Sequence, residues 1–238
     1  FGSGGSIIII PILIYIFKFS IYDATTYSLL LVLLISIFGT LKHMWNHNFH
    51  IGKIGFFIIP TLFFTSISRV FLFPNIPEEM FFINLSKDSF LMFLFSVVIF
   101  TCGISVLIKK PINVKYNFKI LLFFLGLLVG TLTGILGIGG GFIILPALVV
   151  FTGMHMKKAV SSTLFIIMLN TLLAIILEVT VFSFQFDWIL IGGILISSLI
   201  GVILGIWLLS KININMVKKI FSISLLLLSL VIFIIELL

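Results

Sequence analysis

The sequence predicts an all-α, polytopic membrane protein with two inverted repeats of about four helices each, in which glycine-rich helices are broken or re-entrant. Three observations support this prediction. The 238 residues are 61% hydrophobic and 9% charged, which leaves too few polar side chains to cover a soluble protein. Several apolar runs reach about twenty residues, enough for a helix to cross roughly 30 Å of hydrocarbon. The third observation is an internal repeat that contains two glycine clusters.

The apolar segments follow one another along the whole chain. They span residues 7–19, 24–42, 54–73, 89–108, 119–136, 142–153, 159–177, 188–209 and 217–236. Segments 7–19 and 142–153 are too short to cross a bilayer unaided. Each of these two follows a glycine cluster, GSGGS at 2–6 and GIGGG at 137–141. We expect the longer segments to cross the membrane as helices.

The two halves of the chain align without a gap at an offset of 135 residues (137 minus 2). At this offset Gly4, Gly5, Pro11 and Ala24 fall on Gly139, Gly140, Pro146 and Ala159. Agreement over about thirty positions is hard to attribute to composition. We therefore divide the chain into a first transmembrane repeat at 1–108, a cytoplasmic linker at 109–118 and a second repeat at 119–238. Because segment 119–136 has no counterpart, we expect a glycine-containing helix to precede Phe1.

The lysines predict the orientation of each half, since Lys and Arg favour the cytoplasmic side. Lys109, Lys110, Lys115 and Lys119 place the linker inside. Counting crossings from there makes the connection at 18–23 external and its repeat partner at 153–158 internal. The repeats are then inverted, which is typical of secondary transporters with a substrate site near the membrane midplane.

The glycine cluster at 137–141 is the candidate substrate site. Consecutive glycines release the backbone from the helix, which hydrocarbon tolerates only where protein or water lines the unpaired amides. The next helix points its N–H groups and positive dipole end at this place, which attracts anions. Two inverted copies can bring two such helix ends to one oxyanion, together with nearby hydroxyls such as that of Thr25. The predicted substrate-binding residues are Gly137, Gly139, Gly140, Gly141, Pro146, Gly4, Gly5, Pro11, Thr26, Ser28, Ser161, Ser162, Thr163 and Asn170.

The motif GxxxGxLGIGGGFxxxPxL at 130–148 resembles the TauE/SafE family of sulfite exporters and related permeases. The degenerate copy FGSGGSIIIIPIL at 1–13 and the AVSST stretch at 159–163 extend the resemblance over nearly the whole chain. The first copy departs from the motif at Ser6, which replaces the third glycine of the cluster. The resemblance implies transport of sulfite, sulfonates or related organosulfur anions across the bacterial inner membrane. Substrates differ among family members, so membership does not fix the substrate.

Two charged residues near helix ends each allow two interpretations. Arg69 lies about one turn from the outer end of its segment, where snorkelling to the interface is the preferred interpretation and attraction of anions to an outer vestibule is the alternative. Glu178 is the repeat partner of His43. Either of these two can carry a coupling proton, although a solvated helix end is the preferred interpretation.

Two stripes of small residues at intervals of four predict close packing of helices in lipid. The stripes are Gly126, Gly130 and Gly134 in one segment, and Gly193, Ser197, Gly201 and Gly205 in another.

An intramembrane enzyme and a membrane scaffold are the two alternative functional classes. An enzyme needs a nucleophile with a base, or a metal cluster, and the sequence has no HExxH and no intramembrane Asp pair. His43, His47 and His50 follow helical spacing without a carboxylate or thiol, so we predict no metal and no cofactor. A scaffold does not need two broken-helix motifs in opposite orientations.

The net charge of +7 comes from lysines at the ends of apolar runs, which does not indicate a nucleic-acid partner. The sequence therefore predicts a non-enzymatic secondary transporter that moves a small anion by alternating access. Its expected partners are the anion, the lipid bilayer and a candidate coupling proton.

Overall fold

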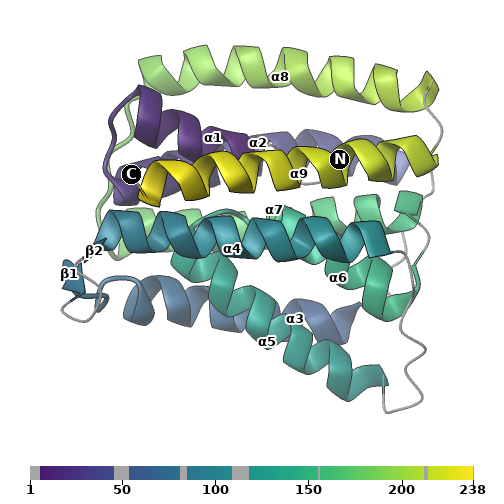
Figure 1. Ribbon diagram of the computed structural model, residues 1–238, viewed down its shortest axis with the longest axis horizontal. Coiled ribbons are helices and arrows are strands. Elements are labelled where there is room, and N and C mark those ends of the chain that lie inside the picture. The colour runs from purple at the N-terminus through teal and green to yellow at the C-terminus, as the bar shows by residue number, and fades with distance from the viewer. Residues whose placement is uncertain are drawn as a thin grey trace.

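Helices of similar direction lie side by side in the computed structural model (Figure 1). The structure describes residues 6–45, 54–80, 85–108, 118–154, 156–211 and 214–237. The α-helices are α1 (Ser6–Pro11), α2 (Ile21–Trp45), α3 (Gly55–Ile67), α4 (Lys87–Ile108), α5 (Phe118–Leu136), α6 (Gly141–Thr152), α7 (Met156–Thr180), α8 (Trp188–Lys211) and α9 (Ile214–Leu237). Two π-helical turns, η1 (Ile12–Ile16) and η2 (Ser68–Leu72), continue α1 and α3. The strands β1 (Glu79–Met80) and β2 (Leu85–Ser86) pair antiparallel.

The helical fold confirms the all-α part of the prediction, with this strand pair as an addition to it. Among the described residues, six helices are long and apolar enough to span a membrane. They include Ile21–Lys42, Lys87–Ile108 and Lys158–Thr180. The two segments predicted to be too short appear as Ile7–Ile16 and Gly141–Thr152. Linker 109–118 lies outside the described residues except for Phe118, where α5 begins.

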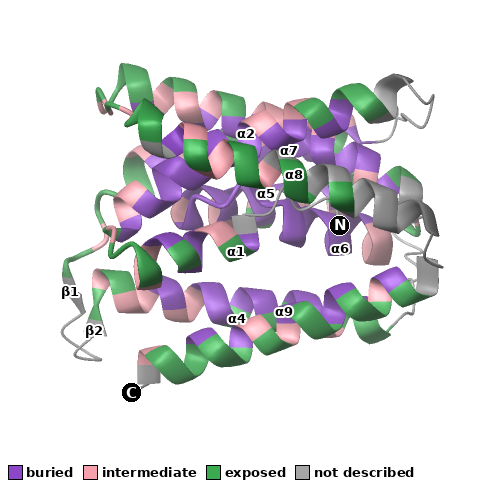
Figure 2. Cartoon of the chain, turned by 90° about the horizontal axis from the view of Figure 1, so that it is seen from above, coloured by how far each residue is buried: buried purple, intermediate pink, exposed green. Residues whose placement is uncertain are grey.

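The helices α2 and α7 form the centre of the bundle and run antiparallel. Gly39 near the end of α2 faces Leu164 near the start of α7, whereas Tyr22 at the start of α2 reaches Glu178 near the end of α7. Figure 2 shows long buried stretches of both helices, with α6 also buried beside them. Ala24 lies on α2, and Ala159, which the sequence offset of 135 pairs with it, lies on α7.

The two short helical segments lead to opposite ends of the bundle (Figure 1). The segment α1 with η1 leads to residues 17–20, at the end that carries the strand pair. There the backbone N–H of Ile21 donates to Asp88 Oδ2 at 3.4 Å. The helix α6 leads to the other end, where α7 begins.

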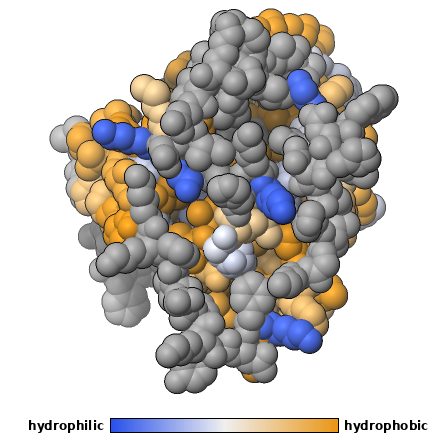
Figure 3. Space-filling view, turned by 90° about the vertical axis from the view of Figure 1, so that its right-hand side faces the viewer, coloured by the Kyte–Doolittle hydropathy of each residue, from blue (hydrophilic) through white to orange (hydrophobic). Residues whose placement is uncertain are grey.

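Several exposed lysines lie at the end of the bundle opposite the strand pair, while Lys18 and Lys87 lie at the strand-pair end. The exposed lysines at the end opposite the strand pair are Lys42, Lys119, Lys158 and Lys219. Figure 3 views this end and shows separate hydrophilic side chains among apolar ones. Their position agrees with the expectation that this end faces the cytoplasm.

The glycine stripe of α5 packs closely against α3, as predicted. A Cβ added at Gly126, Gly130 or Gly134 would lie 2.5–2.6 Å from a backbone carbonyl oxygen of α3. The hydroxyl of Thr65 on α3 also donates to the carbonyl oxygen of Gly130 at 3.2 Å. Only a residue without a side chain fits between the two backbones.

The stripe of α8 differs from this pattern. A Cβ added at Gly193 or Gly201 would meet nothing within 4 Å, and Ser197 is exposed. Among the described residues, the packing predicted for this stripe is therefore absent. A stripe of small residues allows another helix to pack closely, but the sequence does not show whether such a helix lies there.

Replacing Gly130 by alanine is expected to destabilise the protein by about 1–3 kcal/mol, the usual cost of overpacking. The new methyl group would press on the carbonyl oxygen and Cα of Thr61, which belong to the backbone and cannot rotate away. Thermal unfolding in detergent measures the effect. Gly193→Ala on α8 is the matched control and should leave stability unchanged or slightly higher, because alanine favours helix. Equal unfolding temperatures for the two variants would contradict this packing.

Candidate functional site

A turn of glycines breaks the helix between α5 and α6. The φ angles of Gly137, Gly139 and Gly140 are +62°, +67° and +75°, in the left-handed region that favours glycine. The N–H of Gly137 still donates to Thr133 O at 2.9 Å, and the N–H of Ile143 donates to Gly140 O at 3.0 Å. The first amides of α6 need acceptors from outside their own helix. The predicted helix break is thus confirmed.

The glycine turn lies in the protein interior, between α2, η2 and α7. A Cβ added at Gly137 would overlap Thr25 and lie 3.1 Å from Arg69 Nη1. A Cβ added at Gly139 would lie 2.9 Å from both Val32 Cγ1 and Thr171 Cγ2. All residues from 137 to 148 are buried. The turn is therefore lined by protein, as a broken helix in a membrane requires.

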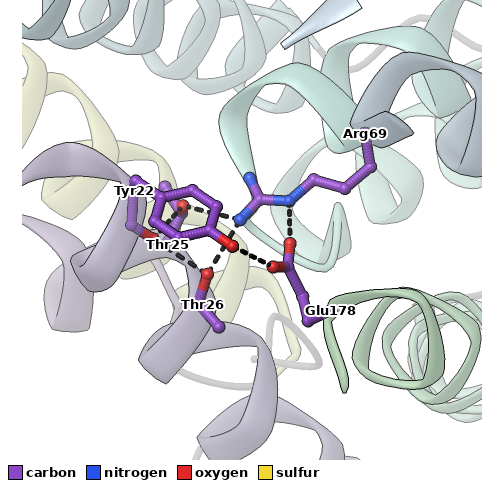
Figure 4. Close-up of polar contacts among 5 residues, drawn as sticks. All are labelled: Tyr22, Thr25, Thr26, Arg69 and Glu178. Carbon is purple, nitrogen blue, oxygen red and sulfur yellow. Dashed lines mark hydrogen bonds and ion pairs between the residues drawn. The ribbon is translucent and has the colours of Figure 1, made fainter. Parts of the chain in front are cut away.

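A buried ion pair lies beside this turn (Figure 4). The side chains of Arg69 and Glu178 are 1% and 0% exposed, and Arg69 Nε donates to Glu178 Oε1. Arg69 Nη2 donates to Thr25 Oγ1 at 3.2 Å and to Thr26 Oγ1 at 2.9 Å. The hydroxyl of Tyr22 donates to Glu178 Oε2 at 2.7 Å. We refer to Tyr22, Thr25, Thr26, Arg69 and Glu178 as the polar centre.

Local backbone structure explains how these side chains meet. Arg69 lies on the π-helical turn η2, where Phe73 N donates to Ser68 O at 2.8 Å, and such turns are frequent at functional sites. The hydroxyls of Thr25 and Thr26 both donate to Tyr22 O at 2.9 Å. Their oxygens are then oriented to accept from Arg69. The first turns of α2 thus present acceptors to a guanidinium from η2.

The preferred interpretations of Arg69 and Glu178 are wrong. Arg69 does not snorkel to an interface and Glu178 is not a solvated helix end, because both side chains are buried against each other. A buried charge is costly unless it is paired, and each group supplies the other's partner. The two residues are 109 positions apart, so hydropathy alone could not show the pairing. The available signal was the presence of an ionisable residue inside an apolar run.

The polar centre has unused hydrogen-bonding capacity. Within the described residues, Arg69 Nη1 has no acceptor, and neither Ser68 Oγ, next in the chain, nor Thr133 Oγ1, beside Gly140, has a partner. Arginine carries five N–H donors, and the two on Nη1 face the turn at Gly137. Buried polar atoms are rarely left unpaired in folded proteins. Free donors beside a helix N-terminus suit an anionic ligand.

The predicted site residues divide into two groups by their position. Gly137 and Thr26 lie at the polar centre, Gly139 and Gly140 follow in the same glycine turn, and Gly141 begins α6. Ser161, Ser162 and Thr163 lie at the far end of α7, at least 15 residues (178 minus 163) before Glu178, which is about 22 Å of helix. The structure therefore does not bring these three hydroxyls to the polar centre.

The remaining predicted residues are distributed along the core. Pro11 and Pro146 are buried in α1 and α6. Ser28, Thr163 and Asn170 are buried, and their side-chain polar atoms have no partner among the described residues. Gly4, Gly5, His47 and His50 lie outside the described residues, and nothing is described of the His43 side chain.

A cavity of about 680 Å³ opens at the end of the bundle that carries the strand pair. It is lined by Ser20, Ile21, Tyr22, Phe73, Pro74, Glu78, Ser86, Lys87, Asp88 and Phe182. The rings of Phe73 and Tyr22 lie 4.5 Å and 5.4 Å from Arg69 Cζ. Both residues line the cavity and their rings contact the guanidinium, so they form an aromatic layer between the cavity and Arg69.

The chain matches one protein family over almost its whole length. The family model for "Sulfite exporter TauE/SafE" matches residues 1–232 and confirms the resemblance seen in the glycine motif. No curated protein and no solved structure matches the chain. The matched range includes both glycine clusters, every residue of the polar centre and the lining of the cavity.

Proposed function

Because the chain belongs to the TauE/SafE family of sulfite exporters, which are membrane transporters, we propose that it is a secondary transporter of a small sulfur-containing oxyanion. Sulfite, a sulfonate or a related organosulfur anion is the substrate class that we infer, and the bacterial inner membrane is the location. The family and the apolar helices make the protein a multi-pass membrane protein.

The observation that carries this proposal is Nη1 of buried Arg69, which lies at the glycine turn and has no acceptor among the residues that the structure describes. A guanidinium binds oxyanions through paired N–H donors, and the N-terminus of α6 adds backbone N–H groups and a positive dipole end. The hydroxyl of Ser68 lies next to Arg69 in the chain and has no partner among the described residues. We infer that one oxygen of the anion accepts from the Arg69 guanidinium and that another accepts from backbone N–H groups at the start of α6.

Access from one side is through the cavity above the aromatic layer. Lys87 Nζ lies 4.8 Å from the Phe73 ring, and Glu78 and Asp88 line the same cavity. Rotation of Phe73 or Tyr22 would connect the cavity with the polar centre. We propose that these two rings are the gate on this side of the membrane.

Access from the other side is proposed to involve the second repeat. Antiparallel packing of α2 and α7 supports an inverted repeat, as does the exit of the two short helical segments at opposite ends. We propose that the halves 1–108 and 119–238 rock against each other to give alternating access. Ser28, Thr163 and Asn170 carry buried polar atoms without partners in the described part of the chain, which supports a polar path along α2 and α7.

Flux in proteoliposomes tests the proposed function. Vesicles containing the protein are loaded separately with sulfite, thiosulfate, sulfate and methanesulfonate, and efflux of each anion is measured. We expect selective efflux of at least one sulfur oxyanion above protein-free vesicles. The Gly139→Leu variant should lose this flux, because its side chain would clash with Val32 and Thr171 in a left-handed turn.

Folding of the Gly139→Leu variant is checked by its elution from a size-exclusion column as a single species in detergent. Gly192→Leu on α8 is the control, since no atom lies within 4 Å of a Cβ added there. This variant should transport like the unmodified protein. Absence of flux for all four anions in folded protein would overturn the proposed function.

A further inference from the structure

The charges of the polar centre cancel each other when no anion is bound. Arg69 contributes one positive charge and Glu178 one negative charge, while Tyr22, Thr25 and Thr26 are neutral. The partner of the guanidinium is thus a carboxylate that belongs to the protein. A transported oxyanion has the same chemistry as this carboxylate, so the two compete for one cation.

We propose that Glu178 competes with the transported anion for Arg69 and takes up one proton when the anion binds, so that each anion moves together with a proton. The inference rests on the proposed function and adds the coupling ion. In this step the Glu178 carboxylate and one proton from water form a neutral carboxylic acid. The anion then makes the ionic contact with Arg69 in place of the carboxylate.

The contacts of Glu178 explain why protonation and anion binding are linked. Glu178 Oε1 accepts from Arg69 Nε and Oε2 accepts from Tyr22, so both carboxylate oxygens are engaged. Arg69 still has Nη1 free at the glycine turn, which is where an anion can first bind. The Glu178 carboxylate and a monovalent anion on one buried guanidinium leave one negative charge uncompensated, and an uncompensated buried charge is strongly unfavourable. Proton uptake by Glu178 removes that charge.

Tyr22 provides a route for the proton. Its ring lines the cavity, and its hydroxyl donates to Glu178 at 2.7 Å. A hydroxyl can donate to a carboxylate and accept from a carboxylic acid, so the contact can persist in both protonation states. Tyr22 therefore connects the carboxyl group of Glu178 with the water-accessible end of the bundle.

Among the contacts of the described residues, Arg69 and Tyr22 are the ionisable groups that reach Glu178. On α2, Asp23 follows Tyr22 and accepts from the Ser20 hydroxyl at 2.7 Å. Glu78, Lys87 and Asp88 line the cavity on the other side of the aromatic layer. On η2, Arg69 is the charged group in contact with the carboxylate. Glu178 is thus the carboxylate that exchanges its partner when Arg69 binds an anion.

Proton uptake during anion binding tests this inference directly. Thiosulfate or methanesulfonate at matched pH is added to the purified protein in weakly buffered detergent solution, and a glass electrode records the pH. Both probes keep a constant charge near neutral pH, so any proton uptake belongs to the protein. We expect uptake of about one proton per bound anion, and an affinity that rises as the pH is lowered.

Two variants assign the proton to Glu178. In Glu178→Gln the uptake should vanish and the affinity should become independent of pH. The control is Glu236→Gln, which removes another glutamate that accepts from a tyrosine, Tyr15, at 2.5 Å but has no arginine partner among the described contacts. This control should retain the uptake of the unmodified protein.

The outcomes separate the inference from the proposed function. Anion binding without proton uptake in the unmodified protein would overturn the inference and leave the proposed function intact. Uptake that persists in Glu178→Gln would also overturn it, by assigning the proton to another group. If Glu178→Gln does not fold, Tyr22→Phe serves instead, and it should slow proton-driven flux in vesicles while anion exchange at equal pH continues. Absence of both binding and flux would overturn the proposed function itself.

Discussion

Replacing Arg69 by methionine is expected to abolish anion transport and to lower stability by about 3–5 kcal/mol, the usual cost of leaving one member of a buried ion pair alone. Methionine fills a similar volume but cannot donate to Glu178, Thr25 or Thr26. Glu178, which is 0% exposed, would lose its counter-charge. Thermal unfolding in detergent and flux in proteoliposomes measure the two effects.

The double variant Arg69→Met with Glu178→Met separates stability from transport. An apolar pair of similar volume often replaces a buried ion pair without loss of stability. We therefore expect the double variant to unfold near the temperature of the unmodified protein and still to show no flux. Substantial flux in the folded double variant would show that the anion does not bind to Arg69.

Replacing Gly137 by alanine is expected to reduce flux by at least about tenfold. The methyl group would overlap Thr25 and lie 3.1 Å from Arg69 Nη1, in the place that we assign to the anion. The backbone there has a φ angle of +62°, which costs an L-residue roughly 1–2 kcal/mol. The flux assay with the transported anion measures the result.

Gly153→Ala is the matched control for this variant. Gly153 has a nearly equal φ angle of +64°, but a Cβ added there would meet nothing within 4 Å. Both variants carry the same backbone strain, and only Gly137→Ala also fills the site. Equal flux in the two variants would contradict the assignment of the anion to the space beside Gly137.

Much of the fold could be predicted because membrane helices leave a strong signal in one sequence. Apolar runs of sufficient length predicted the membrane-spanning helices. Positive φ angles at Gly137, Gly139 and Gly140 confirm the predicted break before α6. The stripe at Gly126, Gly130 and Gly134 predicted a close contact that α3 provides. In each case the pattern lies within one short stretch of sequence, and hydrocarbon allows few backbone structures for such a stretch.

The composition of the site was harder to predict because it depends on contacts between distant segments. Arg69 and Glu178 looked like ordinary helix ends until α3 with η2 and α7 brought them together. The hydroxyls of Ser161 and Thr163 belong to the same repeat motif as those of Thr26 and Ser28. Because α2 and α7 are antiparallel, these hydroxyl groups lie at different depths rather than at one point.

Calorimetric titration of sulfite, thiosulfate and methanesulfonate into the purified protein tests the central claim most directly, because it measures binding without transport. We predict saturable binding of at least one of these anions to the unmodified protein and none to the folded Arg69→Met/Glu178→Met variant. Equal affinity of the two proteins for the same anion would contradict the claim that Arg69 and the glycine turn form the anion site.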